Sequence, residues 1–146
     1  MHSSTSPFLA IVGLVLLITS FVSFRMRPAK PSRIAFVAAV SPGILMLVLF
    51  YSLVIHMHQS LGAWPTSIGE RGFPTSLIIH DSIAGGFFYI LLLVTFFIWP
   101  IVFLLCLLVR RWRACVYYIG VYGLASAVCF AATSLAPTGF LDWLWD

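Results

Sequence analysis

Four long apolar runs, separated by short polar segments, make up most of this chain. They cover residues 8–24, 34–55, 82–109 and 114–136. A helix rises about 1.5 Å per residue, so runs of this length reach across most or all of a hydrocarbon core about 30 Å thick. The pattern predicts an all-α fold: a four-helix transmembrane bundle in which residues 1–146 form a single transmembrane domain.

The composition indicates a lipid environment. The chain is 62% hydrophobic and only 8% charged, whereas a soluble domain carries roughly 25% charged residues. A core of this size cannot hide so much apolar surface, and we expect the lipid bilayer to cover it. The basic residues form two short clusters rather than a stripe with interleaved aromatic residues, which argues against a nucleic-acid partner.

The charges sort to opposite sides of the predicted bundle. Seven of the eight Lys and Arg residues lie in segments 25–33 and 110–113, which connect the first two and the last two runs. The acidic residues lie on the other side: Glu70, Asp81, Asp142 and Asp146. Short loops rich in Lys and Arg stay in the cytoplasm. We therefore expect a multi-pass protein of the inner (plasma) membrane with both termini extracytoplasmic.

The longest polar interruption is the segment 56–81, HMHQSLGAWPTSIGERGFPTSLIIHD, which holds three of the four histidines. Its glycines and prolines predict an outer loop. The tail 137–146 is too short to cross the membrane again, and its aromatic residues suit the membrane interface. Within the runs, Pro42 and Pro100 predict bends, because proline removes a backbone hydrogen bond from a helix.

Histidines at the two ends of this outer loop form the candidate site. The residues that could meet at one metal ion are His56, His58, His80 and Asp81. Imidazole binds copper, zinc and haem iron, and a neighbouring carboxylate can orient the ring or act as a ligand. On a continuous helix His56 and His58 lie about 200° apart, so only one of them can join such a site. The alternative is a set of interfacial histidines that reach water or loop carbonyls, and the sequence predicts no definite cofactor.

Small residues recur at every fourth position in two of the runs. The two series are Ala35, Ala39 and Gly43, and Gly123, Ala127 and Ala131. This spacing lets helix backbones approach closely, and close packing drives helix association in lipid. The partner helix could belong to this chain, to a second copy or to another membrane protein.

The outer loop contains the sequence Leu-Gly-Ala-Trp-Pro at positions 61–65. Gly62, Trp64 and Pro65 fit a Gly-x-Trp-Pro segment, and Pro74 stands in the place of a later proline, although the stretch between departs from the pattern. In these residues the loop and its flanking runs resemble a set of small bacterial multi-pass membrane proteins of unknown function. The resemblance implies a bacterial inner membrane and no particular activity. Trp64 precedes a proline and so favours an extended backbone, from which its ring can cover the bundle end.

Three functions remain open from the sequence. The first, which we favour, is a non-enzymatic accessory or structural protein that packs against other membrane helices. The second is a metal- or haem-handling redox protein that uses the outer histidines. The third is a small-solute carrier or an integral-membrane enzyme. No catalytic motif is present, and no charged residue lies in the middle of a run, which argues against a pump or coupled transporter.

Overall fold

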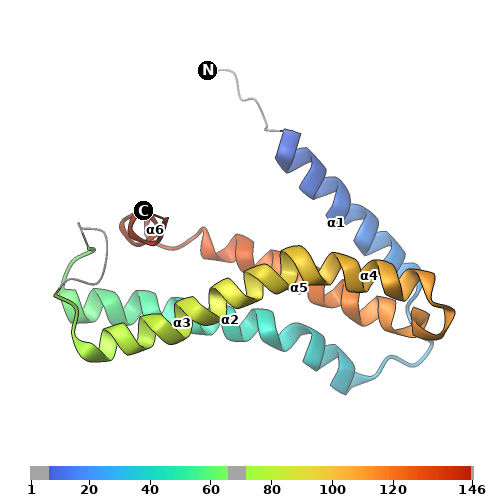
Figure 1. The fold of residues 1–146 in the computed structure, drawn as a ribbon, viewed down its shortest axis with the longest axis horizontal. Coiled ribbons are helices and arrows are strands. Elements are labelled where there is room, and N and C mark those ends of the chain that lie inside the picture. Colours follow the sequence, from blue (N-terminus) through green and yellow to red (C-terminus); the bar gives the residue numbers. More distant parts are fainter. Residues whose placement is uncertain (1–6, 66–71, 146) are drawn as a thin grey trace.

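The computed structural model describes residues 7–65 and 72–145, with the side chains of the first helix described from Gly13 onward. Every regular element in these residues is a helix, so the all-α prediction is confirmed for them. The helices drawn in Figure 1 are α1 (Pro7–Arg25), α2 (Arg33–Leu61), α3 (Thr75–Leu93), η1 (Val94–Ile98), α4 (Trp99–Leu108), η2 (Arg110–Cys115), α5 (Val116–Thr133) and α6 (Thr138–Trp145). Within residues 7–65 and 72–145, three continuous stretches are long and apolar enough to cross a membrane: Arg33–Leu61, Thr75–Leu108 and Arg110–Thr133.

α2 runs beyond its apolar run into the predicted outer loop. It continues to Leu61 because the polar sequence HMHQSL contains neither glycine nor proline. Gly62 then ends it with a φ of 68°, a left-handed conformation that glycine adopts without strain, and its N–H bonds to the His58 carbonyl at 3.0 Å. α3 begins directly after Pro74. The helical ends therefore carry the histidines, and the connection is shorter than the predicted segment 56–81.

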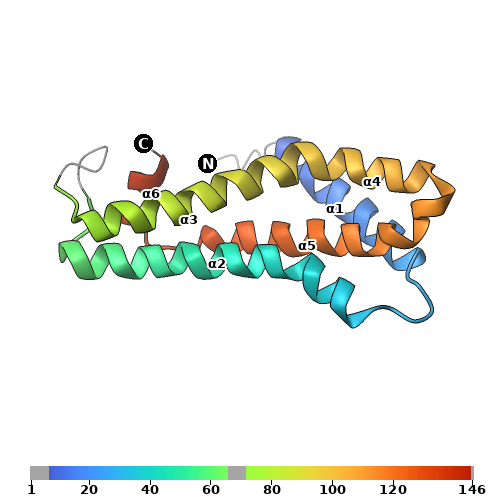
Figure 2. The same cartoon turned by 60° about the horizontal axis from the view of Figure 1, so that its bottom comes forward.

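Both prolines that predicted bends lie within long helical stretches. Pro42 lies inside α2, and Figure 2 shows α2 changing direction in its N-terminal part. Pro100 lies at the start of α4, directly after η1, which is a single π-helical turn. Proline cannot donate to the regular helical ladder and crowds the preceding turn, and a wider π-turn relieves that conflict.

Three helical stretches lie side by side along the long axis: α2, α5 and the α3–η1–α4 segment (Figures 1 and 2). The most extensive helix–helix contact joins α2 to α5, and the next joins α2 to α3. α1 packs on α5 and leaves the bundle at an angle (Figure 1). A small second core lies near the start of α5, where Phe103, Cys106 and Val116 are buried against Val22 and Met26.

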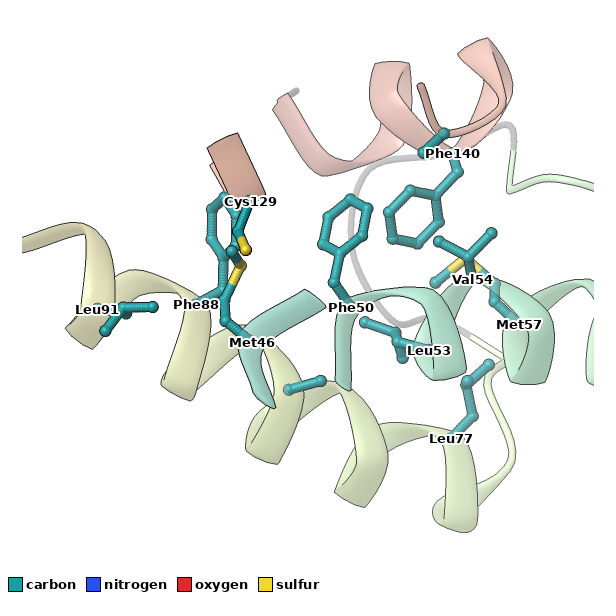
Figure 3. Close-up of a cluster of buried hydrophobic side chains, with 12 residues drawn as sticks. Met46, Phe50, Leu53, Val54, Met57, Leu77, Phe88, Leu91, Cys129 and Phe140 are labelled. Atoms are coloured by element: carbon teal, nitrogen blue, oxygen red, sulfur yellow. The ribbon is translucent and has the colours of Figure 1, made fainter. Parts of the chain in front are cut away.

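The main core lies between α2, α3, α5 and α6, toward the end of the bundle that carries the histidines (Figure 3). Phe140 of α6 is fully buried there, and its ring meets that of Phe50 edge-on at 5.4 Å between centroids. The interfacial location of the tail stays a prediction; in the structure α6 contributes a core residue, while Trp145 at its end is exposed. An aromatic residue in a short amphipathic helix can pack on a core or lie at the membrane interface. Phe140 packs beside Phe50.

The charged residues of the described chain separate to the two ends of the bundle. Segments 25–33 and 110–113 lie together at one end, where α1 is followed by α2 and α4 by α5 (Figure 1). Asp81 on α3 and Asp142 on α6 lie toward the opposite end. Glu70, Arg71 and Asp146 lie outside the described residues. Within the described part of the chain, the basic end is therefore a positive surface without acidic neighbours.

Candidate functional site

Two of the predicted site residues, His56 and His80, are in direct contact. Nδ1 of His56 lies 2.8 Å from Nδ1 of His80, and the ring centroids are 5.1 Å apart. His56 lies near the C-terminal end of α2, and His80 lies in the first turns of α3, which packs against α2. Because α3 runs back along α2 after the connection, the two rings reach the same depth in the bundle. Both side chains are half-buried.

Ser52 extends this contact into a row of three side chains. It lies four residues before His56 and so shares the same face of α2. Its Oγ is 3.0 Å from Nε2 of His80, which gives His80 a partner at each ring nitrogen. The Ser52 hydroxyl also donates to the Leu49 carbonyl at 2.8 Å.

The single hydroxyl hydrogen of Ser52 sets the direction of these hydrogen bonds. With that hydrogen on the Leu49 carbonyl, Ser52 Oγ accepts from Nε2–H of His80. Neutral His80 then has a lone pair on Nδ1, which accepts from Nδ1–H of His56. Nε2 of His56 keeps a lone pair and has no partner among the described residues. It is therefore the open end of the row, with a lone pair that a proton or a metal ion can reach.

The other two predicted site residues lie elsewhere. His58 is on the opposite face of α2 from His56, as the helical period requires, and it stacks on Trp64 with ring centroids 4.7 Å apart. Asp81 lines a hollow of about 410 Å³ together with Trp143 of α6. Among the described residues, no group of three or more His, Cys, Asp or Glu side chains is placed to hold a metal ion. The structure therefore brings together two imidazoles of the predicted four-residue set.

A pair of imidazoles in this arrangement can share a proton or present nitrogen ligands. A proton added at Nε2 of His56 makes that ring a donor at both nitrogens, and the Nδ1–H···Nδ1 contact passes the charge toward His80. A copper or zinc ion held between the two Nδ1 atoms would first require the hydrogen of His56 to move to Nε2, because a metal ligand needs a free lone pair. Its remaining ligands would come from water or from a bound partner.

Trp64 lies over the end of the bundle, on the His58 face of α2. Its half-buried ring stacks on His58 and meets the ring of Phe140 edge-on at 6.3 Å. Gly139 of α6 makes room for it, since a Cβ added there would lie 2.8 Å from ring atoms of Trp64. Pro65 follows and restricts the backbone before it. The indole thus covers the end of the main core, of which Phe140 is a part.

The small residues of the two predicted packing series have unequal surroundings. Gly43 is buried against α5, where an added Cβ would lie 3.1 Å from Sγ of Cys129. Gly123 is buried beneath the indole of Trp99 on α4. Of the others, Ala127 is half-buried, Ala131 is exposed, and Ala35 and Ala39 line an apolar groove. One glycine in each series therefore packs within this chain, and the alanines of α2 remain accessible.

Ser52 is a site residue that the sequence pattern did not predict, because a hydroxyl inside an apolar run normally bonds back to its own helix. It does so here and contacts His80 as well. The four-residue spacing from Ser52 to His56 was the available signal. Trp99 was also missed: its Nε1–H donates to the Ile119 carbonyl at 2.7 Å and so ties α4 to α5.

No protein family, curated protein or solved structure matches this chain. The resemblance at Gly62, Trp64 and Pro65 therefore stays a prediction. The function has to follow from the surfaces and polar contacts of the molecule itself.

Proposed function

We propose that this chain is a non-enzymatic accessory protein of the bacterial inner membrane that packs against helices of other membrane proteins. The observation that carries this proposal is an apolar groove of about 420 Å³ on the side of the bundle. The groove lies between the N-terminal part of α2, the η1–α4 segment and α5. Its lining residues are Ala35, Ala38, Ala39, Val94, Ile98, Trp99, Val102, Tyr118, Ile119 and Tyr122.

The groove combines small residues on one side with aromatic rings on the other. Ala35, Ala38 and Ala39 keep the backbone of α2 close to the surface. Trp99, Tyr118 and Tyr122 form the opposite wall. Small residues let a second helix approach closely, and such packing drives association between helices in lipid.

The polar atoms of the aromatic wall are already used inside the chain. The indole N–H of Trp99 donates to the backbone of α5, and the Tyr122 hydroxyl lies 3.0 Å from the Thr95 hydroxyl. The Tyr118 hydroxyl accepts from the Ser32 N–H at 2.6 Å. The groove therefore offers apolar contact, which suits a hydrophobic helix better than a polar substrate.

In this proposal the chain crosses the membrane four times, with α1 as the additional span and both termini outside the cytoplasm. The exposed side chains of α1 support a fourth span, because they are large and apolar: Leu14, Val15, Leu17, Ile18, Phe21 and Phe24. Only Thr19 and Ser23 are buried among the described side chains of α1. The positive surface at the end of segments 25–33 and 110–113 supports a cytoplasmic location for that end.

Site-specific cross-linking in native membranes tests the proposal. A photo-reactive side chain at Ile98, on the edge of the groove, should give a discrete adduct larger than the 16.2 kDa chain. The same group at Phe97, which is exposed but outside the groove lining, is the matched control. Equal adducts from both positions, or none from Ile98, would reject the groove as an interface. An adduct of twice the chain mass would identify the partner as a second copy.

A second candidate function, in metal or haem handling, is favoured by one observation: the 2.8 Å contact between Nδ1 atoms of His56 and His80. Two imidazoles on separate helices are a minimal pair of nitrogen ligands for copper, zinc or haem iron. Metal analysis and an optical spectrum of protein purified without added metal test this function. Stoichiometric metal or haem that is lost in His80→Ala would place it above the accessory function.

A further inference from the structure

A separate hollow of about 390 Å³ lies at the basic end of the bundle, between the α1–α2 connection, the start of α2 and α5. Its lining residues are Arg27, Pro31, Ser32, Arg33, Phe36, Val37 and Tyr117. The arginines lie at the connection and the first residue of α2. Phe36 and Val37 lie about one helical turn further along α2, roughly 5 Å farther from the basic end of the bundle. The hollow thus has a cationic outer part and an apolar inner part.

Three polar groups in this lining have no partner among the described residues. The guanidinium groups of Arg27 and Arg33 make no hydrogen bond or ion pair there, and both side chains are exposed. Tyr117 is only 7% exposed, and its hydroxyl makes no hydrogen bond to a described residue. A ligand in the hollow can therefore engage these groups without first breaking a contact within the described residues.

The hollow is held in shape by hydrogen bonds that leave these groups free. The Ser32 N–H donates to the Tyr118 hydroxyl and so fixes the connection on α5. The Ser32 hydroxyl accepts from the Ala35 N–H at 3.3 Å and caps α2. The rings of Tyr117 and Tyr118 meet edge-on at 5.2 Å, which fixes the buried phenol. A ligand would therefore meet a preformed site.

We infer that this hollow binds an anionic glycerophospholipid. The headgroup phosphate pairs with Arg27 and Arg33, because guanidinium groups match phosphate oxygens in charge and geometry. The Tyr117 hydroxyl donates to a phosphate or ester oxygen. One acyl chain lies along Phe36 and Val37. No acidic residue of the described chain lies at this end to compete with the phosphate, and anionic lipid is the natural counterion of a juxtamembrane basic cluster.

Native mass spectrometry of the full chain in neutral detergent, titrated with phosphatidylglycerol, tests the inference. Arg27→Gln combined with Arg33→Gln should weaken binding on the order of tenfold or more, since two charge-assisted contacts are lost. Arg110→Gln combined with Arg111→Gln is the matched control. It removes the same charge from the same end of the bundle but from outside the hollow lining. Equal weakening by both pairs would show diffuse attraction and overturn the site.

Tyr117→Phe removes only the hydroxyl and should also weaken phosphatidylglycerol binding, while Tyr89→Phe, an exposed tyrosine on α3, should not. Phosphatidylcholine, whose headgroup carries no net charge, should bind much more weakly than phosphatidylglycerol. Equal binding of the two lipids, or equal effects of the two tyrosine variants, would overturn the assignment. Displacement of the lipid by millimolar inorganic phosphate would show an anion site in place of a lipid site.

Discussion

Nδ1 of His56 and Nδ1 of His80 lie 2.8 Å apart across the interface between α2 and α3. The contact joins two helices that the outer connection separates in sequence, and Ser52 continues it on the other side of His80. Hydrogen bonds between half-buried side chains on different helices fix helix register, because a shift of either helix breaks both at once. The same row leaves one ring nitrogen open for chemistry.

A double-mutant cycle measures the interaction free energy between His56 and His80. Replacing His56, His80 or both with Ala in the purified protein should reveal a coupling free energy of about 1 kcal/mol in reversible unfolding, the usual net value of one hydrogen bond. The matched cycle pairs His58 with His80, and its coupling should be near zero, because His58 stacks on Trp64 instead. Similar coupling in both cycles would contradict the observed contact.

The contact of Trp64 with Gly139 predicts a strong effect of a single methyl group. A Cβ at Gly139 would lie 2.8 Å from the indole, so Gly139→Ala should lower the free energy of unfolding by about 1–3 kcal/mol, as overpacking does. Gly86 on α3 has no neighbouring atom within 4 Å of an added Cβ, so Gly86→Ala should be neutral or stabilising by up to about 1 kcal/mol. Thermal unfolding of Gly139→Ala and Gly86→Ala, measured under the same conditions, tests this prediction. A neutral Gly139→Ala would show that Trp64 does not dock on α6.

The apolar runs predicted the helical stretches well, because long apolar helices are defined by composition over many residues. Their ends were predicted less well. The sequence from His56 to Leu61 is polar, yet it stays helical until Gly62, since polarity alone does not stop a helix. A helix ends where the backbone leaves the helical conformation, and in a sequence only glycine and proline indicate such a position directly.

The sequence predicted the part of the candidate site that depends on local helix geometry, and it did not predict the part that depends on how the helices pack. Helical period separated His56 from His58 correctly, because that relation is local. Which of them meets His80 depends on how α2 and α3 pack, and that follows from the burial of many side chains in the main core. The contacts of Ser52 with His80 and of Phe140 with Phe50 were not predicted for the same reason: each joins residues distant in sequence.

Close packing of α4 on α5 rests on Gly123. An added Cβ would overlap ring atoms of Trp99, so Gly123→Ala should displace the indole and break its hydrogen bond to the Ile119 carbonyl. We expect a loss of about 1–3 kcal/mol in unfolding free energy and a shift in tryptophan fluorescence. Val128→Leu, on an exposed face of α5, should change the unfolding free energy by less than about 0.5 kcal/mol. Equal effects would mean that Gly123 does not pack on Trp99.

The proposed orientation is tested by labelling from one side of the membrane. In a background without Cys106, Cys115 and Cys129, single cysteines replace Ser60, near the histidine end, and Ala29, at the basic end, both of which are exposed. An impermeant thiol reagent added to intact cells should label Ser60→Cys and leave Ala29→Cys unlabelled until the membrane is opened, because the proposed orientation puts the basic end in the cytoplasm. The reverse pattern would overturn the orientation, although both internal contacts of the histidine row would stand.

The groove beside α2 allows the sharpest test of the accessory function, because it can be filled without disturbing the fold. Ala38 is exposed and lines the groove, so Ala38→Leu should change the unfolding free energy of the isolated chain by less than about 0.5 kcal/mol. A partner helix packed on that alanine would meet the larger side chain, and overpacking of about 1–3 kcal/mol would weaken association by roughly 5- to 150-fold. The photo-adduct from Ile98 should therefore fall sharply in Ala38→Leu. Ala131→Leu makes the same exchange at an exposed site on α5 and should leave the adduct unchanged. If Ala131→Leu abolished the adduct and Ala38→Leu did not, the association surface would be the second small-residue series and not the groove.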